Sequence, residues 1–300
     1  MKIEKFLDLN IGYLEKPGEI NQADNLDLVL LEQNIPGLFW KANKIIWRLD
    51  INPQYPFGHL DRKKRKKLFH NAKQADKLGI KVVLENDLKQ ESFIKWFEIY
   101  QKQTEEKSLG RLAISQKWLA ERQEKGEKVG GILVYQGDNM LGGLLFKKFL
   151  KKNRLSVSYR AYIRKNGLEL GIGGLLEYYL LYFISGMGFK TITRGRDTNL
   201  YGHHLSPGLF HFKRSYGFFP WINPEFEDIE ISSCAFISFD KFPHDNILFL
   251  TGEQLDLTLH IIYRDQLPDI KLYEAVSIKK VEIYTRREIL DKHSQIIRSW

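Results

Sequence analysis

The sequence predicts an α/β fold in which a mixed sheet is flanked by helices and both ends of the chain add short strands. Alternating apolar residues mark three consecutive strands between residues 131 and 163. A nearly apolar helix over 172–187 and a short strand over 191–194 follow them. Short apolar runs fill the first 60 residues and recur after Pro224, which is typical of strands joined by turns.

The three central strands are expected to form an antiparallel meander. They occupy residues 131–135, 140–149 and 154–163. Gly137 and Asn153 stand in the two turns. In the third strand alternate residues are apolar, so one face belongs to the core and the other can line a cleft. We expect the strand over 191–194 to join the same sheet.

A strongly basic helix precedes this sheet. Asp61 opens it, Gly79 ends it, and its first two turns read Arg62-Lys63-Lys64-Arg65-Lys66-Lys67. Cations near a helix N-terminus face the positive end of the macrodipole and repel one another. The run is either a solvated face screened by salt or a docking site for phosphate groups of a donor, RNA or lipid. A strand, an aromatic helix and a second helix follow, at residues 80–84, 92–100 and 116–123.

The net charge of +9, from 46 Lys and Arg against 37 Asp and Glu, favours polyanionic partners without choosing among them. Nucleic acid, a phospholipid surface and a phosphate-rich cofactor all remain open. The sequence has no zinc-finger spacing, no aromatic RNA-binding signature and no lysine-bearing phosphate loop. Its 43% apolar residues are ample for a core.

The compartment predicted is the cytoplasm. The single cysteine, Cys234, cannot form an internal disulfide, and acidic residues interrupt the N-terminal stretch where a signal peptide needs an apolar run. Residues 172–189 approach the length of a membrane span, but Glu177 interrupts them and glycines frame their ends. We therefore expect a buried helix and no integral membrane span.

The start of that helix carries the clearest chemical signal. Gly171 and Gly173 allow a tight turn into the helix, whose first N–H groups can hold an anion such as a phosphorylated acyl donor. Further along, Gly195-Arg196-Asp197 ends the strand, and Phe212-Lys213 and Gly217 follow in the next helix. This combination points to acyl transfer.

The order of elements over 91–222 resembles the GNAT acyltransferase fold, and in detail its FemABX-like branch. The segment 62–84 is similar to the basic helix and strand that precede the transferase domain in that branch. The strand end Gly195-Arg196-Asp197 and the run from Gly208 to Gly217 are similar to the branch's strand end and its Gly-x-x-x-Phe-Lys-x-x-x-Gly region.

The resemblance implies three segments: an N-terminal region over 1–90, which can be a reduced first GNAT-like unit, an acyltransferase domain over 91–222 and a strand-rich extension over 223–300. It implies acyl-CoA as donor substrate, no metal, and an amine of a small molecule or cell-envelope precursor as acceptor. FemABX proteins proper take aminoacyl groups from charged tRNA, so a tRNA-dependent aminoacyltransferase is one alternative. A non-catalytic module that binds RNA or a membrane surface is the other.

The donor site implied by the resemblance departs from the family pattern at one place. The phosphate loop of GNAT enzymes commonly opens with Gln or Arg, and here Leu168 stands there. Because backbone N–H groups hold most of the pyrophosphate, this change weakens the motif without abolishing it. The predicted donor-binding residues are Leu168, Gly171, Ile172, Gly173, Gly174 and Arg196.

The predicted catalytic residues are Lys213, Asp197, Glu177 and His204. Lys213 matches the family's lysine and would stabilise the oxyanion of a tetrahedral intermediate or a donor phosphate; a surface lysine is the alternative. Asp197 and Glu177 are candidate proton acceptors, although Glu177 can also face a polar partner. His204 suits acceptor contact or general base work, because imidazole titrates near neutral pH. No cysteine or acid near the histidines has ligand spacing, so we expect no metal.

Overall fold

The computed structural model describes residues 2–15, 25–107, 110–163, 171–223 and 229–298. They group into two compact units. The central unit comprises residues 48–195, and the terminal unit combines residues 1–47 with 196–300. Each unit therefore contains residues from more than one of the three segments predicted from the sequence, which are 1–90, 91–222 and 223–300. Leu168, the first residue of the predicted phosphate loop, lies outside the described residues.

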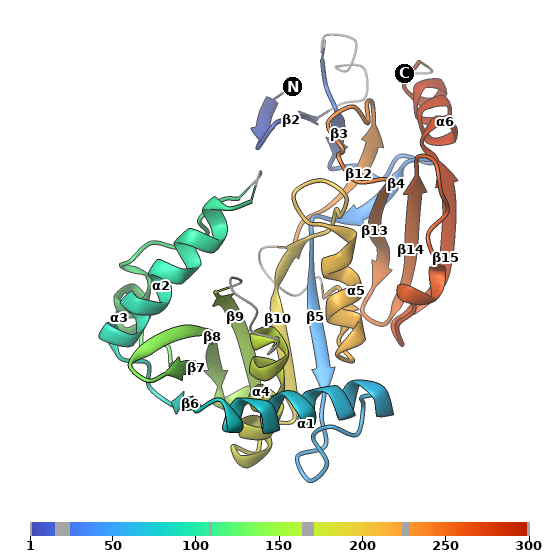
Figure 1. Cartoon of the computed structure of the whole chain (residues 1–300). Helices are drawn as coiled ribbons and strands as arrows, with labels where there is room; N and C mark the ends of the chain where they lie inside the picture. The colour runs from blue at the N-terminus through green and yellow to red at the C-terminus, as the bar shows by residue number, and fades with distance from the viewer. Residues whose placement is uncertain (1, 16–24, 108–109, 164–170, 224–228, 299–300) are drawn as a thin grey trace. The chain divides into compact units, whose positions relative to one another are not determined.

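The central unit is built on one mixed sheet. Its elements are α1 (Arg62–Lys77), β6 (Ile80–Glu85), α2 (Gln90–Glu105), α3 (Trp118–Glu124), β7 (Val129–Gln136), β8 (Asn139–Phe149), a 3₁₀ turn (Leu150–Lys152), β9 (Arg154–Tyr162) and α4 (Ile172–Gly186) (Figure 1). Two strands, β5 (Lys44–Asp50) and β10 (Thr191–Thr198), run through the boundaries between the units. The strand order of the sheet is β11-β5-β10-β9-β8-β7-β6, in which β11 is Phe219–Trp221.

The predicted meander is confirmed. Strands β7, β8 and β9 pair antiparallel, and β10 pairs with β9 in parallel after α4. The first turn has Gly137 at φ +58° and the second has Asn153 at φ +45°, the left-handed conformation that these residue types tolerate. The order and direction of these strands therefore agree with the turn residues and the apolar alternation, and each antiparallel pair contains one register shift.

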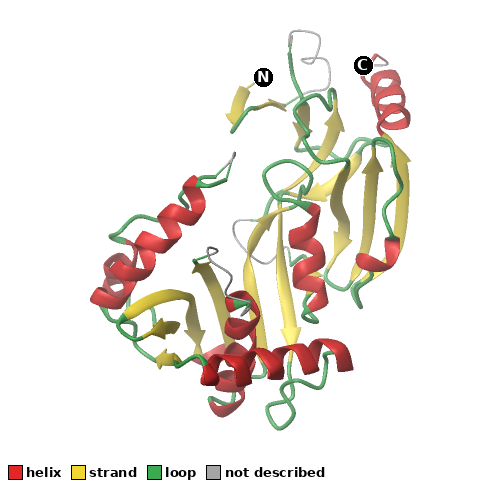
Figure 2. Ribbon diagram, in the orientation of Figure 1, coloured by secondary structure: helices red, strands yellow, loops and turns green. Residues whose placement is uncertain are grey.

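Helices cover both faces of the central sheet (Figure 2). Helices α2 and α3 pack on one face through an aromatic cluster of Phe93, Trp96 and Trp118, while α4 packs on β7, β8 and β9, and α1 packs on α4. Strand β7 is therefore buried on both sides over Val129–Val134, where a half-exposed strand would alternate. The expected burial of the apolar helix is confirmed for α4, whose Leu175, Leu176 and Leu180 are fully buried.

The parallel pair β9–β10 is short. Only Arg154–Val157 of β9 pairs with Thr191–Arg194 of β10. Beyond that point Ser158 has no partner on β8, because the register shifts between Leu145 and Phe146, and such a bulge bends its strand. On β10 the next residue, Gly195, takes φ +30°. A local bend in each strand thus coincides with the end of their pairing.

The terminal unit contains two further sheets. One has the order β1-β2-β3-β12-β4 and the other the order β13-β14-β15. Their strands are β1 (Lys2–Phe6), β2 (Leu9–Leu14), β3 (Leu28–Leu31), β4 (Phe39–Ala42), β12 (Ile231–Phe236), β13 (Asn246–Glu253), β14 (Asp256–Tyr263) and β15 (Ile278–Thr285). The remaining elements are α5 (Pro207–Ser215), β11 (Phe219–Trp221), a 3₁₀ turn (Ile270–Leu272) and α6 (Arg286–Arg298). A core rich in phenylalanine, including Phe39, Phe236 and Phe249, joins these sheets to α6.

The fold class predicted from the sequence is correct. In chain order β6, α2, α3, β7, β8, β9, α4, β10, α5 and β11 give a mixed sheet flanked by helices, with strand-rich segments before and after it. None of the described helices combines the length and the apolar character that a membrane span requires.

Candidate functional site

The N-terminus of α4 is the first candidate site. Gly171 is its N-cap, at φ −60° and ψ +86°, and as a glycine it has no side chain that could cap the helix. The Gly171 carbonyl accepts from Gly174 N at 2.7 Å and from Leu175 N at 3.0 Å. The N–H groups of Ile172 and Gly173 have no acceptor among the described residues, so they and the helix dipole can receive an anion.

Gly173 permits a close approach beside these N–H groups. A Cβ placed on Gly173 would lie 3.1 Å from the hydroxyl oxygen of Tyr162, at the end of β9. Glycine at this position therefore lets the tyrosine hydroxyl stand against the first turn of α4. A larger residue would fit more easily at position 171, since a Cβ placed on Gly171 would lie no nearer than 3.7 Å to any neighbouring atom. The predicted glycine pair thus combines an open helix start with a hydroxyl beside it.

Glu177 lies further along α4 and is only 1% exposed. One carboxylate oxygen accepts from Arg160 Nη1 of β9 at 3.0 Å, and the other is ion-paired with Arg194 Nη2 of β10. Both arginines belong to the strands whose pairing ends nearby. The buried carboxylate therefore ties α4 to both strands, with each of its oxygens engaged.

The second candidate site is a hydrogen-bonded cluster in the terminal unit, centred on Asp197 of β10. Its Oδ2 atom accepts from Lys213 Nζ at 2.5 Å, from Tyr201 Oη at 2.6 Å and from Trp47 Nε1 at 3.0 Å. The side chains of Lys213 and Asp197 are 8% and 12% exposed. This burial rules out the alternative that Lys213 is a solvated surface lysine.

Aromatic packing holds the cluster in place. Phe210, fully buried on α5, meets the rings of Trp47 and Tyr201 edge-on, at centroid distances of 4.8 and 5.4 Å. Lys213 follows on the same helix, three residues later, with its Nζ 5.6 Å from the Trp47 ring. Burial, and then the charge of Asp197, raise the pKa of Tyr201 well above its ordinary value of 10. Tyr201 therefore stays protonated at neutral pH and acts as a donor.

The predicted residues His204 and Arg196 also belong to the terminal unit. His204 packs edge-on against Phe6, with centroids 5.0 Å apart. Burial, and then the neighbouring His203, lower the pKa of His204 to about 4, so its ring is neutral at pH 7. His203 is itself paired with Asp8 at 2.5 Å. Arg196 is exposed on β10.

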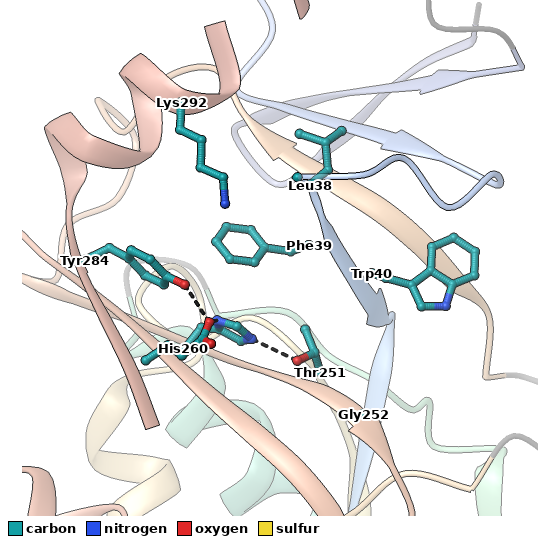
Figure 3. A pocket seen from close by; sticks show the side chains of 10 residues that line it. Leu38, Phe39, Trp40, Thr251, Gly252, His260, Tyr284 and Lys292 are labelled. Carbon is teal, nitrogen blue, oxygen red and sulfur yellow. Dashed lines mark hydrogen bonds and ion pairs between the residues drawn. The ribbon is translucent and has the colours of Figure 1, made fainter. Parts of the chain in front are cut away.

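A pocket in the terminal unit was not anticipated from the sequence (Figure 3). It has a volume of about 370 Å³ and lies beside Phe39, with Lys292 at its edge. His260 and Thr251 line it, joined by a hydrogen bond of 2.8 Å, and Tyr284 donates to Glu282 at 2.5 Å. These residues sit on three strands that pair side by side, so only the tertiary register could reveal the cluster.

The structure thus divides the predicted site residues into two groups. Lys213 and Asp197 are in direct contact in the terminal unit, whereas Gly171, Ile172, Gly173, Gly174 and Glu177 belong to the central unit. The sequence interpretation did not include Trp47 among the site residues, although the indole N–H of a buried tryptophan usually finds a hydrogen-bond acceptor. Within the described residues, no group of three histidine, cysteine or acidic side chains is arranged to hold a metal ion.

Comparison with known proteins gives structural likenesses only. FemX has 11% sequence identity, with 73% of this chain and 80% of that chain covered and a TM-score of 0.45. L-PGS from Bacillus licheniformis has 14% identity, 70% and 67% coverage and a TM-score of 0.43. An aminoglycoside acetyltransferase from an uncultured soil metagenomic sample has 16% identity, 41% and 80% coverage and a TM-score of 0.33. No protein-family model and no curated protein sequence matches this chain.

Proposed function

We propose that this protein is an acyltransferase that moves an acyl group from a phosphorylated donor, acyl-CoA, to an amine of a small-molecule or cell-envelope precursor. One observation carries the proposal: the uncapped glycine start of α4, which follows β9 in a GNAT-like succession of elements. Ligands of open α/β sheets commonly bind at such strand ends, next to a helix N-terminus.

In this proposal the N–H groups of Ile172 and Gly173 bind phosphate oxygens of the donor, and the Tyr162 hydroxyl adds a third donor. Glycine at the N-cap supports this role, because a serine, threonine, aspartate or asparagine side chain at that position would accept a hydrogen bond from one of these N–H groups. The departure at Leu168 is then tolerable, since backbone groups supply the binding.

Lys213 supplies the positive charge in this account. Attack of a neutral amine on a thioester places negative charge on the carbonyl oxygen, and a fixed cation stabilises that charge. The C–S bond then breaks, and CoA leaves as a thiol that carries the proton lost by the amine. Asp197 and Glu177 act as positioning residues rather than as bases, because Asp197 already accepts three hydrogen bonds and Glu177 faces two arginines. His204, neutral at pH 7, is the proposed contact with the acceptor.

An acyl-transfer assay tests the proposal, with a panel of acyl-CoAs and amines and Lys213→Met as the variant. If Lys213 acts on the transition state, turnover falls by roughly one hundredfold to one thousandfold while donor affinity changes little. Lys271→Met, at an exposed lysine of the same unit, is the matched control and should leave both unchanged. Equal turnover and affinity in wild type and Lys213→Met would contradict the role of Lys213.

The basic start of α1 favours one second candidate, an aminoacyl-tRNA-dependent transferase. Six consecutive cations occupy the first six positions of that helix, with no acidic residue in its first turn. A polyphosphate backbone would neutralise them. Donor binding that persists after ribonuclease treatment supports acyl-CoA, and donor binding that is lost supports tRNA.

A further inference from the structure

Helix α1 places one polar side chain against the candidate donor site. Its buried face, packed on α4, consists of Leu68, Asn71, Ala72 and Ala75. Asn71 is only 7% exposed, and its amide nitrogen lies 3.7 Å from the position that a Cβ would take on Gly171. No hydrogen-bond partner of this amide exists in the described part of the chain. The Asn71 amide therefore lies beside the open N–H groups of α4 without a hydrogen-bond partner among the described residues.

Of the four buried residues of α1, only Asn71 is polar. An apolar residue would suit the rest of this helix face, where Leu68 and Ala75 are 1% and 0% exposed. Packing of α1 on α4 thus gives no reason for asparagine at position 71, whereas a ligand at the start of α4 would satisfy its amide.

We propose that Asn71 is a donor-binding residue, contributed by α1, that hydrogen-bonds a phosphate oxygen of the ligand held at the N-terminus of α4. This inference rests on the proposed function and adds a side chain from a different helix to the site. It also gives the basic run of α1 a role, since Lys67 and Lys64 precede Asn71 by four and seven residues and therefore share its side of the helix.

The crowding of those cations fits a ligand with more than one phosphate. Lys64 is half-buried, and burial, followed by the charge of Lys67, lowers its pKa. Phosphate groups along this side of α1 would offset the repulsion between the two lysines. CoA and the phosphodiester backbone of tRNA both carry several phosphate groups. Binding measurements with CoA and with tRNA separately distinguish these two sources.

The test compares wild type with Asn71→Leu by titration calorimetry, using CoA and tRNA as separate probes, together with chemical denaturation of each protein. Loss of one hydrogen bond to a charged group should weaken binding by about tenfold to one hundredfold. The free energy of unfolding should stay the same or rise, because the Asn71 amide has no hydrogen bond to lose among the described residues. Asn71→Ala serves as a second variant, and Lys73→Gln, at an exposed cation of α1 outside the basic run, as the control for general electrostatics.

The outcomes separate this inference from the proposed function. Weaker binding of either probe in Asn71→Leu or Asn71→Ala, with stability retained, supports it and identifies the phosphate source. A purely structural asparagine would show the reverse, with lower stability and unchanged affinity, and that result overturns the inference while leaving the proposed function intact. Failure of wild type to bind either CoA or tRNA overturns both.

Discussion

At the scale of single residues, Asp197 is the most connected polar group that the two candidate sites contain. One of its oxygens accepts hydrogen bonds from Lys213, Tyr201 and Trp47. Three donors around one carboxylate oxygen fix the direction of the Asp197 side chain. The lysine charge is fixed in turn, which is the condition under which a cation stabilises a transition state without reorganising.

Replacing Asp197 with Asn should therefore destabilise the fold. The buried ammonium of Lys213 would lose its carboxylate, and removing one partner of a buried ion pair typically costs about 3–5 kcal/mol. The double variant Asp197→Asn with Lys213→Met should recover part of the loss, because the unpaired charge is gone. Chemical denaturation measures both. A loss below about 0.5 kcal/mol in the single variant would show that the pair does not matter to the fold.

At the scale of elements, α4 joins the two strands whose pairing ends beside it. Glu177 makes this connection through Arg160 of β9 and Arg194 of β10. The uncapped start of the helix, four to six residues earlier, is thereby held against β9, where the Tyr162 hydroxyl approaches Gly173. The geometry of the anion site thus depends on a buried charge that need not touch any ligand.

Glu177→Gln should lower the free energy of unfolding by about 3–5 kcal/mol, since Arg160 and Arg194 lose the charge they share. Donor affinity in the variant that remains folded should also fall, because the start of α4 is no longer fixed. Glu121→Gln on α3, an exposed residue, is the matched control and should stay within about 0.5 kcal/mol of wild type. Equal stability of the two variants would contradict the bracing role of Glu177.

The elements of the central unit were largely predictable, because local signals specify them. Alternating apolar residues, the turns at Gly137 and Asn153 and the N-cap Asp61 all lie within a few residues of the elements they define. The pairing of β12 with β3 and β4 was not predictable, since about two hundred residues separate Ser233 from Leu31 and no local pattern encodes such a partner.

The candidate sites also combine features that the local sequence specifies with features that depend on distant parts of the chain. The open start of α4 follows from two glycines near one another in the chain. The Lys213–Asp197 contact was foreseen only as two separate candidates, because it also requires Trp47, 150 residues before Asp197. The unpaired Asn71 depends on how α1 packs on α4, and its position in the sequence resembles that of any polar residue within a helix.

At the scale of the whole molecule, buried histidines should make stability depend on pH. Burial lowers the pKa values of His260 and His293 to about 4, from an ordinary value of 6.5. His293 accepts a hydrogen bond from Phe236 N at 2.9 Å and packs near Phe39, as His260 does (Figure 3). Both rings are therefore neutral in the folded state at pH 7.

The sign of the effect follows from proton binding. Between pH 6.5 and about 4 the unfolded chain binds protons at these histidines and the folded chain does not, so the free energy of unfolding falls as the pH falls. Each histidine contributes on the order of 1–3 kcal/mol over this range. Denaturation at a series of pH values should show a smaller slope for His260→Gln, and an unchanged slope for His70→Gln at an exposed histidine of α1. Equal slopes in all three proteins would contradict this account.

Hydrogen–deuterium exchange in the presence of CoA tests the central claim most directly. The claim is that the N–H groups of Ile172 and Gly173, at the start of α4, bind the phosphates of the donor. Saturating CoA should slow exchange of these amides by at least about tenfold, since exchange requires the hydrogen bond to open. Binding of CoA with no slowing at residues 172 and 173, or with protection confined to other elements, would contradict it.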